Sequence, residues 1–183
     1  LNNLLTAHIE GGEVSGTIDD LLRHSISKLS HIHFVSNIEA KRRLIQMGEE
    51  DSSVFVIGSP DVDIMLSDKL PEFAAVKKVY DIPFDNYAIL IFHPVTTEFD
   101  NIRWQVENLV DAVLESGLNY VVVNPNNDLG SDFIFLEYKR LRDNSHIRAF
   151  PSIRFERFLV LMKNAKFILG NSSSGIREAP YYG

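Results

Sequence analysis

The sequence contains no cysteine, and only one of its 183 residues is tryptophan. Without cysteine, neither a disulfide framework nor a metal site with thiolate ligands can form. No apolar run approaches the roughly 20 residues that a helix needs to cross a bilayer, and no signal peptide is visible. The lack of cysteine thus excludes a disulfide-stapled scaffold in these residues, and the lack of a long apolar run predicts no membrane partner. Both features are typical of a cytoplasmic protein.

Basic residues are also in short supply. The 18 lysines and arginines are outnumbered by 25 acidic residues, which gives a net charge of −7. A nucleic-acid-binding protein usually carries a basic stripe, and none is present here, so we expect no nucleic-acid partner. The hydrophobic content of 45% and the charged content of 23% are those of a globular protein. A chain of this length folds as one or two domains.

Strand-like and helix-like patterns alternate along the chain. Short apolar runs predict strands at 4–9, 31–35, 54–57, 87–92, 119–123, 147–150 and 167–169. Helical spacing predicts helices at 18–29, 37–47, 61–65, 72–80, 99–115, 132–142 and 155–164, with another starting near Gly175. The alternation predicts an α/β protein with a parallel sheet.

Ligands of such sheets bind outside the carboxyl ends of the strands. The residues that follow the predicted strands are therefore the first candidates for a site. They are mostly polar or small: Glu10, Gly58-Ser59-Pro60, His93, Asn124-Pro125-Asn126, Pro151-Ser152-Ile153 and Asn171-Ser172-Ser173-Ser174-Gly175.

The motif GNSSSGIRE, residues 170–178, is the most informative of these segments. Three hydroxyls and a glycine at a strand-to-helix turn favour a phosphate or diphosphate site. Simple helix capping by one serine is the alternative, and three serines exceed what a cap needs. If Glu178 contacts a nucleotide, it should accept hydrogen bonds from ribose hydroxyls, because a carboxylate would repel the phosphates. The alternative is a glutamate that stabilises the helix dipole.

The motif HIEGGE, residues 8–13, places a carboxylate at a strand end before two glycines. Glu10 could act as a general acid or base, and the glycines allow a ligand to approach the backbone. The alternative is a solvated glutamate before a turn. His8 is in phase with apolar strand positions, which favours a packed, hydrogen-bonded histidine over a ligand.

The motif FHPVTTE, residues 92–98, places His93 at another strand end. This histidine could bind a phosphate, or it could cap the following helix. Asp19 and Arg23 begin a helix at i,i+4 spacing, for which a capped, salt-bridged helix is a sufficient explanation. The six histidines show no zinc-type pairing with a carboxylate, so we expect no metal site.

Taken in order, HIEGGEVSGTIDD, FHPVTTE, PNNDLGS and GNSSSGIRE resemble the hydrolysing UDP-N-acetylglucosamine 2-epimerases of sialic-acid pathways. They also resemble relatives that act on UDP-N,N′-diacetylbacillosamine. The resemblance covers essentially the whole chain. It implies a glycosyltransferase-B-like fold of two Rossmann-like halves with the substrate between them. Residues 1–36 would end the N-terminal half and 37–183 would form most of the C-terminal, UDP-binding half, truncated at both ends.

The resemblance also implies a chemistry. A carboxylate removes the C2 proton while UDP leaves from C1, and water adds to the resulting 2-acetamidoglycal. Glu10 matches a catalytic glutamate, and His93 a histidine near the diphosphate. The other matches are substrate or nucleotide contacts: Asp19, Arg23, Asn126, Ile153 (through its backbone, to uracil), Ser172, Ser173 and Glu178.

From this resemblance we expect UDP and a UDP-sugar as ligands, no cofactor, and a homo-oligomeric full-length protein. The 183-residue chain alone is expected to bind UDP weakly and to catalyse nothing measurable. Two other functions remain open: a nucleotide-sugar-binding domain without epimerase activity, and a glycosyltransferase of the same architecture. The motif HIEGGE favours the epimerase over both.

Overall fold

The computed structural model describes residues 4–16 and 18–183. The chain divides into two compact units, one up to Leu66 and one from Ser67. The sequence led us to expect a division between residues 36 and 37. The structure instead keeps the segment up to Leu66 in the first unit, because a third strand in that segment pairs with the second strand. None of the helices in the described ranges is long and apolar enough to span a bilayer.

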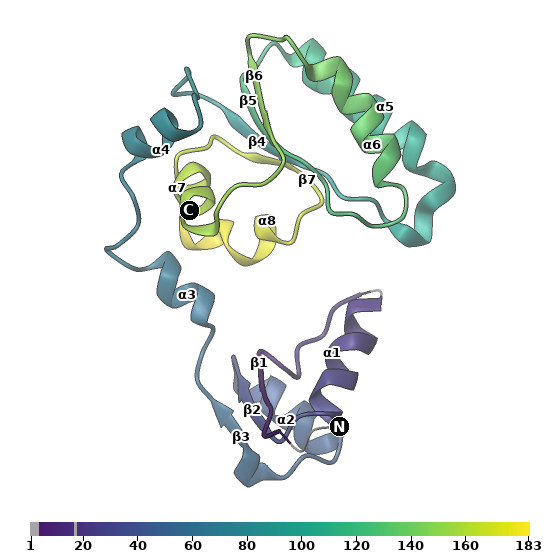
Figure 1. The fold of residues 1–183 in the computed structure, drawn as a ribbon, viewed down its shortest axis with the longest axis vertical. Coiled ribbons are helices and arrows are strands. Elements are labelled where there is room, and N and C mark those ends of the chain that lie inside the picture. Colours follow the sequence, from purple (N-terminus) through teal and green to yellow (C-terminus); the bar gives the residue numbers. More distant parts are fainter. Residues whose placement is uncertain (1–3, 17) are drawn as a thin grey trace. The chain divides into compact units, whose positions relative to one another are not determined.

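The first unit is a small three-stranded parallel sheet with order β1-β2-β3 (Figure 1). Its pairing places His8 beside His33, and His33 beside Val54. The elements are β1 (Ala7–Ile9), α1 (Ile18–Lys28), β2 (Ile32–Val35), α2 (Ile38–Gln46), a 3-10 turn (Asp51–Ser53), β3 (Val54–Val56) and α3 (Pro60–Met65).

Helix α2 packs on this sheet through apolar side chains. Ala40 and Leu44 from the helix form a buried cluster with Val35 of β2 and Val54 of β3. Asn37 begins the helix, because its side chain accepts a hydrogen bond of 2.8 Å from the backbone N–H of Ala40. The helix is therefore fixed both at its first turn and along its apolar face.

Helix α1 presents its polar side to the rest of the unit. Ser27 is buried, whereas Leu21 of the helix and Leu29 directly after it are 70% and 72% exposed. The helical spacing predicted from the sequence is confirmed, but an amphipathic helix usually buries its apolar stripe. Here the contacts of α1 with the rest of the unit are polar: Ser27 lies 3.0 Å from His8 Nδ1 of β1, and Lys28 donates to Glu49.

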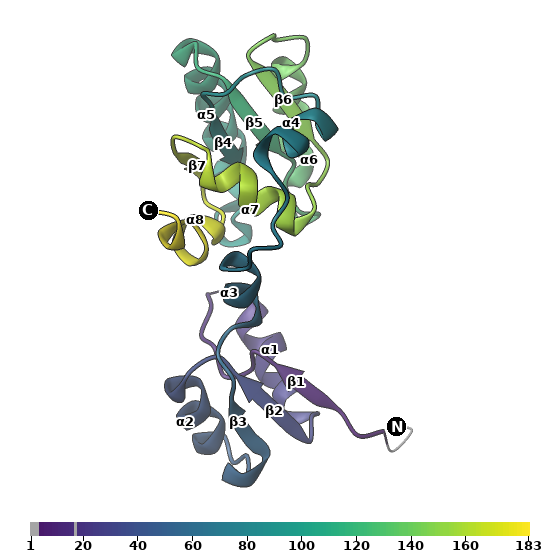
Figure 2. The ribbon, with the colours of Figure 1, turned by 90° about the vertical axis from the view of Figure 1, so that its left-hand side faces the viewer.

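The second unit contains a four-stranded parallel sheet with order β6-β5-β4-β7. Figure 2 labels its four strands. The expected alternation of strands and helices is confirmed. The elements are α4 (Phe73–Val79), β4 (Ala88–Ile91), a 3-10 segment (Thr96–Asn101), α5 (Ile102–Ser116), β5 (Tyr120–Val123), α6 (Ser131–Tyr138), a 3-10 turn (Lys139–Leu141), β6 (Ile147–Phe150), α7 (Phe155–Lys163), β7 (Ile168–Gly170), α8 (Ser174–Arg177) and a 3-10 turn (Ala179–Tyr181).

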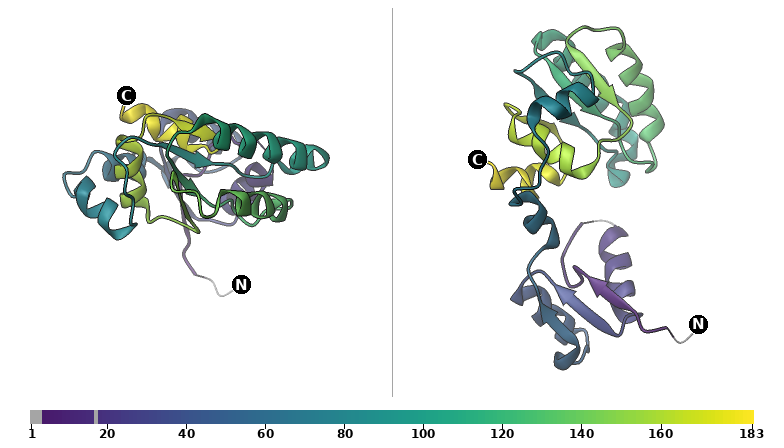
Figure 3. Two further views of the ribbon diagram at one scale, coloured as in Figure 1. Left: turned by 90° about the horizontal axis from the view of Figure 1, so that it is seen from above. Right: turned by 60° about the vertical axis from the view of Figure 1, so that its left-hand side comes forward.

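Helices cover both faces of this sheet (Figure 3, left). Alternate residues of β4 point to opposite faces: Leu90 packs with α5 and α6, and Ile89 packs with α4 and α7. Tyr87 adds a polar link, because its buried hydroxyl donates to the carbonyl oxygen of Leu161 at 2.8 Å. A parallel sheet buried on both faces is the Rossmann-like arrangement expected from the sequence.

Candidate functional site

Glu10 occupies a strained turn at the end of β1. Its φ of 60° lies in the left-handed region, which a residue with a side chain seldom adopts. Its backbone N–H donates to the carbonyl oxygen of Phe34 at 2.8 Å, which continues the pairing of β1 with β2. Its carboxylate oxygen Oε1 accepts a hydrogen bond of 2.6 Å from Ser59 Oγ. Hydrogen bonds therefore hold both the backbone N–H and the carboxylate of Glu10.

The next residues press against helix α2. Gly12 has φ of 76°, and a Cβ at this position would overlap the carbonyl oxygen of Ala40. The carbonyl oxygen of Gly12 accepts a hydrogen bond from the Arg43 guanidinium. Only glycine combines this backbone conformation with so close an approach to a helix, so position 12 requires glycine for structural reasons.

Glu13 anchors the far side of the same turn. Its carboxylate accepts a hydrogen bond from the hydroxyl of Ser36 and another, of 3.2 Å, from the side chain of Asn37. Asn37 is also the residue that caps α2. The turn after β1 is thus tied to the connection between β2 and α2.

His8 supports the turn from within β1. Its Nδ1 lies 3.0 Å from Ser27 Oγ of α1, and a Cβ at Gly11 would lie 2.8 Å from the same nitrogen. Burial, then the charges of His33 and Arg23, lower the pKa of His8, so its ring is neutral at neutral pH. The expectation of a packed, hydrogen-bonded histidine is confirmed.

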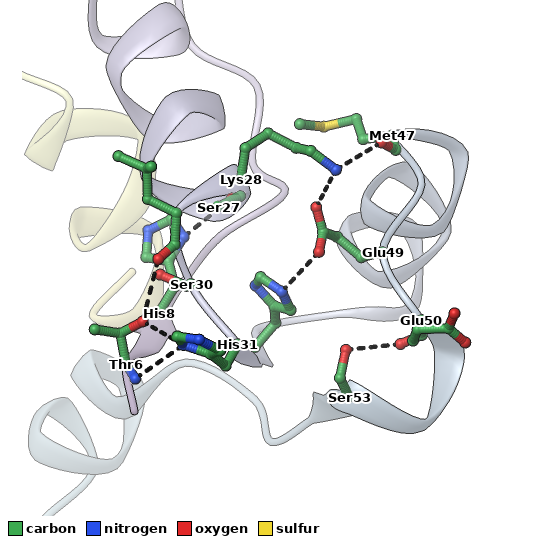
Figure 4. A network of polar contacts seen from close by, with 12 residues as sticks. Thr6, His8, Ser27, Lys28, Ser30, His31, Met47, Glu49, Glu50 and Ser53 are labelled. Atoms are coloured by element: carbon green, nitrogen blue, oxygen red, sulfur yellow. Dashed lines mark hydrogen bonds and ion pairs between the residues drawn. The ribbon is translucent and has the colours of Figure 1, made fainter. Parts of the chain in front are cut away.

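A second polar contact joins α1 to the unit (Figure 4). The Lys28 ammonium donates to Glu49 at 2.7 Å, and the other Glu49 oxygen lies 3.2 Å from Nε2 of the buried His33. Burial alone would raise the pKa of Glu49, but the hydrogen bonds and charges of Lys28 and His33 together lower it. The polar side of α1 is therefore held by hydrogen bonds and by an ion pair.

The start of α1 brings one of its two candidate residues to the turn. Arg23 donates to Ser15 Oγ at 2.7 Å and reaches the carbonyl oxygen of Glu13 at 3.5 Å. Asp19 is exposed and does not form the ion pair with Arg23 that their spacing favours. Asp20 instead accepts a hydrogen bond from the N–H of Ser15 at 3.1 Å. Arg23 thus borders the Glu10 turn, and Asp19 lies on the exposed side of the first helical turn.

In the second unit, His93 follows the central strand β4 and is held by both neighbouring strands. The Asn171 side chain accepts from the His93 N–H and donates to the His93 carbonyl, each at 2.8 Å. On the other side, the backbone N–H of Asn126 donates to His93 Nδ1 at 3.1 Å. The strand order 6-5-4-7 explains this convergence, because Asn126 follows β5 and Asn171 follows β7.

These contacts fix the chemical form of the His93 ring. Burial lowers the pKa of His93, and the opposing effects of Asp128 and Asn126 do not cancel this shift. The ring is therefore neutral at neutral pH. Because Nδ1 accepts a hydrogen bond from Asn126, the proton of the neutral ring is on Nε2, which makes Nε2 a donor. The alternative of a histidine that caps the next helix does not describe this geometry.

The serine turn follows β7. Ser172 Oγ lies 2.9 Å from the hydroxyl of the buried Ser174, and it also accepts from the Ser174 N–H at 3.3 Å. Ser173 is exposed directly before α8. The helix predicted near Gly175 is confirmed, but α8 is only one turn long. The sequence placed Glu178 one turn into a helix, whereas the structure places it where α8 ends and a 3-10 turn begins.

Ile153 lies in the loop after β6, and β5 separates that strand from β4, the strand that His93 follows. It is half-buried against the cluster that includes Val160 and Leu161 of α7. The order of strands thus sets the candidate residues in a row along one edge of the sheet, with Ile153 at one end and the serine turn at the other. In neither unit, over the ranges 4–16 and 18–183, do three histidine, aspartate or glutamate side chains gather closely enough to hold a metal ion.

Ser59, which donates to the Glu10 carboxylate, and Asn171, which pairs with the His93 backbone, are among the contact residues that were not assigned a role from the sequence. Each lies two residues beyond the end of a predicted strand, and that position was the only available signal. It identified the edge of the sheet but not the partner, because each contact joins residues far apart in the sequence.

The chain is similar to known proteins over its whole length. A family model described as UDP-N-acetylglucosamine 2-epimerase matches residues 1–183. The chain is 53% identical to the UDP-N-acetylglucosamine 2-epimerase of Neisseria meningitidis serogroup B over 100% of the chain and 48% of that protein. It is 36% identical to the UDP-N,N′-diacetylbacillosamine 2-epimerase (hydrolyzing) of Legionella pneumophila over 97% of the chain and 47% of that protein.

Solved structures support the fold. The Methanocaldococcus jannaschii UDP-GlcNAc 2-epimerase, solved in complex with UDP-GlcNAc and UDP, matches with a TM-score of 0.69 at 23% identity. That match covers 92% of the chain and 49% of the solved protein. The expected α/β, glycosyltransferase-B-like fold class is thereby confirmed. The chain spans about half the length of the curated relatives that it matches.

Proposed function

The chain belongs to the UDP-N-acetylglucosamine 2-epimerase family, and on that premise we propose that the full-length protein is a hydrolysing UDP-N-acetylglucosamine 2-epimerase. It converts UDP-N-acetylglucosamine and water into N-acetylmannosamine and UDP. Glu10 supplies the carboxylate that moves a proton, and the residues that follow β4 to β7 supply groups that hold the nucleotide.

In the first step, the Glu10 carboxylate removes the proton from C2 of the sugar. The electrons of that C–H bond form a double bond between C1 and C2, and the bond from C1 to the diphosphate oxygen breaks. UDP leaves with the electron pair of the broken C1–O bond, and the product is a 2-acetamidoglycal. In the second step, water adds its hydroxyl to C1 and a proton to C2. This proton arrives on the face of C2 opposite to the one from which Glu10 removed the first proton. The free sugar therefore has the inverted configuration at C2.

The residues at the carboxyl edge of the second sheet bind UDP. His93 Nε2 and the hydroxyls of Ser172 and Ser173 donate hydrogen bonds to the diphosphate, whose negative charge increases as the bond to C1 breaks. Glu178 accepts hydrogen bonds from the ribose hydroxyls, and the backbone of Ile153 binds uracil. Asn126 contacts the nucleotide and also fixes the proton of His93 on Nε2 through its backbone N–H. Asp19 and Arg23 contact the substrate beside Glu10.

The backbone of Glu10 is the observation that carries the catalytic part of the proposal. A left-handed conformation costs a residue with a side chain about 1–2 kcal/mol relative to the ordinary helical conformation. Glycine would avoid that cost, and two glycines stand next to it in the chain. A glutamate at φ of 60° therefore favours a role for its side chain. A domain that only binds nucleotide-sugars has no use for a carboxylate held in this way.

The test is Glu10→Gln in the full-length protein. This change keeps the shape of the side chain but removes its capacity to accept a proton. We expect turnover of UDP-N-acetylglucosamine to fall by at least about a hundredfold, with little change in UDP affinity. Glu39→Gln, in an exposed pair with Arg42 on α2, is the matched control. Wild-type turnover in Glu10→Gln would show that Glu10 is structural and would contradict the proposal.

The main alternative substrate is UDP-N,N′-diacetylbacillosamine. The similarity to the Legionella pneumophila protein, named as the hydrolysing epimerase of that sugar, supports it. Both reactions use the same proton removal at C2, so Glu10 does not distinguish them. Incubating the full-length protein with each UDP-sugar, and identifying the free sugar by mass spectrometry, separates the two. Release of neither sugar would favour a nucleotide-sugar-binding domain without epimerase activity.

A further inference from the structure

Ser59 makes the hydrogen bond that orients the Glu10 carboxylate. Its hydroxyl donates to Glu10 Oε1 at 2.6 Å, a short distance typical of a hydroxyl that donates to a carboxylate. The two residues are 49 positions apart in the sequence but lie in the same compact unit. Because β3 is in the same parallel sheet as β1, the residues after the two strands emerge at the same edge.

The hydroxyl of Ser59 does not serve the helix that it precedes. Ser59 occupies the N-cap position of α3, where a serine usually accepts a hydrogen bond from a backbone N–H of the first turn. No side-chain capping bond forms here, although Pro60 at the first helical position is otherwise typical of a helix start. The side chain is turned toward Glu10 instead, so local helix stability does not explain its direction.

Other contacts of the turn hold the backbone that carries the Glu10 side chain. The Phe34 carbonyl binds the Glu10 N–H, and Arg43 binds the carbonyl oxygen of Gly12. Three rotatable bonds separate this backbone from the carboxylate. The hydrogen bond from Ser59 restricts rotation about these bonds at their far end, at Oε1.

We propose that Ser59 is a positioning residue that holds the Glu10 carboxylate in the orientation needed for proton removal. The inference rests on the proposed function, since it assigns Ser59 a role in the reaction that Glu10 catalyses. Its consequence is specific. Loss of the hydroxyl leaves the fold and the UDP site unchanged, and it lowers the rate at which the carboxylate reaches the C2 proton.

The experiment compares Ser59→Ala, Ser59→Thr and Ser59→Cys in the full-length protein. Misplacement of a reacting group by about 1 Å can lower the rate by about a hundredfold, so we expect kcat of Ser59→Ala to fall by about 10- to 100-fold. UDP affinity and thermal midpoint should stay at the wild-type values. Ser59→Thr keeps a hydroxyl and should restore most of kcat. Ser59→Cys, of similar size but with a weak donor, should resemble Ser59→Ala.

Ser53→Ala is the matched control, because the hydroxyl of Ser53 donates only to the nearby carbonyl of Glu50, at 2.8 Å. It should leave kcat unchanged. A double-mutant cycle then tests whether Ser59 acts through Glu10. If it does, adding Ser59→Ala to Glu10→Gln produces no further loss of kcat. Independent losses that multiply in the double variant would overturn the proposal.

The possible failures can be told apart. If Glu10→Gln abolishes turnover but Ser59→Ala and Ser59→Cys retain wild-type kcat, Ser59 has no positioning role and the proposed function stands. If Glu10→Gln itself turns over normally, the proposed function fails first. If Ser59→Ala does not fold, Ser59→Cys provides the measurement, and a wild-type kcat in that variant overturns the inference.

Discussion

At the scale of single residues, the second unit holds His93 much as a neighbouring strand would. The Asn171 side chain offers one acceptor and one donor, and these meet the N–H and the carbonyl of the same residue. The Asn171 side chain therefore continues the hydrogen bonding between β4 and β7 as far as His93, beyond the last paired residues of the two strands. This leaves the His93 ring directed toward Asn126. Positioning by side-chain amides and hydroxyls is thus common to both candidate regions.

The serine turn provides a residue-scale prediction. Replacing Ser172 and Ser173 together with alanine should weaken UDP binding by about 1–3 kcal/mol, because hydrogen bonds to a charged group are lost. The measurement is titration calorimetry with UDP on the full-length protein. Ser145→Ala is the control, since Ser145 is exposed before β6, at the opposite edge of the sheet. An unchanged UDP affinity in the double variant would remove both serines from the nucleotide site.

At the scale of elements, the edge strand β7 depends on one glycine. Gly170 has φ of 129°, and a Cβ there would overlap the carbonyl oxygen of Ile91 on β4. Gly170→Ala should therefore destabilise the protein by about 2–4 kcal/mol, because the strand must move away from β4 or strain its backbone. Denaturant unfolding followed by circular dichroism measures the change.

Gly175→Ala provides the contrast in the same segment. Gly175 lies in α8, and a Cβ there would meet nothing within 4 Å. Alanine is the better helix former, so this substitution should be neutral or slightly stabilising. Equal stability of the two variants would show that the contact between β7 and β4 is looser than the structure indicates.

The order of elements was predictable from the sequence, and most of their contacts were not. Helical and strand spacing are local, so the segments around α2 and β5 could be located without knowing the fold. The side of α1 that is buried depends on its contacts with His8 and Glu49, which lie in other segments of the chain. The link between Ser59 and Glu10 depends on the pairing of β3 with β2, and no local pattern encodes the order of strands in a parallel sheet.

At the scale of the whole molecule, the two units differ in the size of their cores. In the described part of the first unit, one small cluster around Val35 and Leu44 carries the packing. The sheet of the second unit is covered on both faces by larger clusters, centred on Leu90 and Ile89. Opening of a region costs less free energy when fewer apolar contacts must be broken, so the two units should differ in local stability.

Hydrogen exchange of the 183-residue chain tests this difference. Backbone amides of β2 and α2 should exchange at least about tenfold faster than those of β4 and β5, after correction for intrinsic rates. Mass spectrometry of peptides from the two units gives the comparison. Equal protection in both units would mean that the chain unfolds as one cooperative body.

The outward apolar stripe of α1 determines how the chain behaves in solution as salt is added. The net charge of −7 makes copies of the chain repel one another. At an ionic strength of about 0.1 M the screening length is about 10 Å, so this repulsion acts only at close range. Exposed Leu21 and Leu22 gain by removal from water at any ionic strength. The colloidal stability of the chain therefore comes from its charge, and it decreases as salt screens that charge.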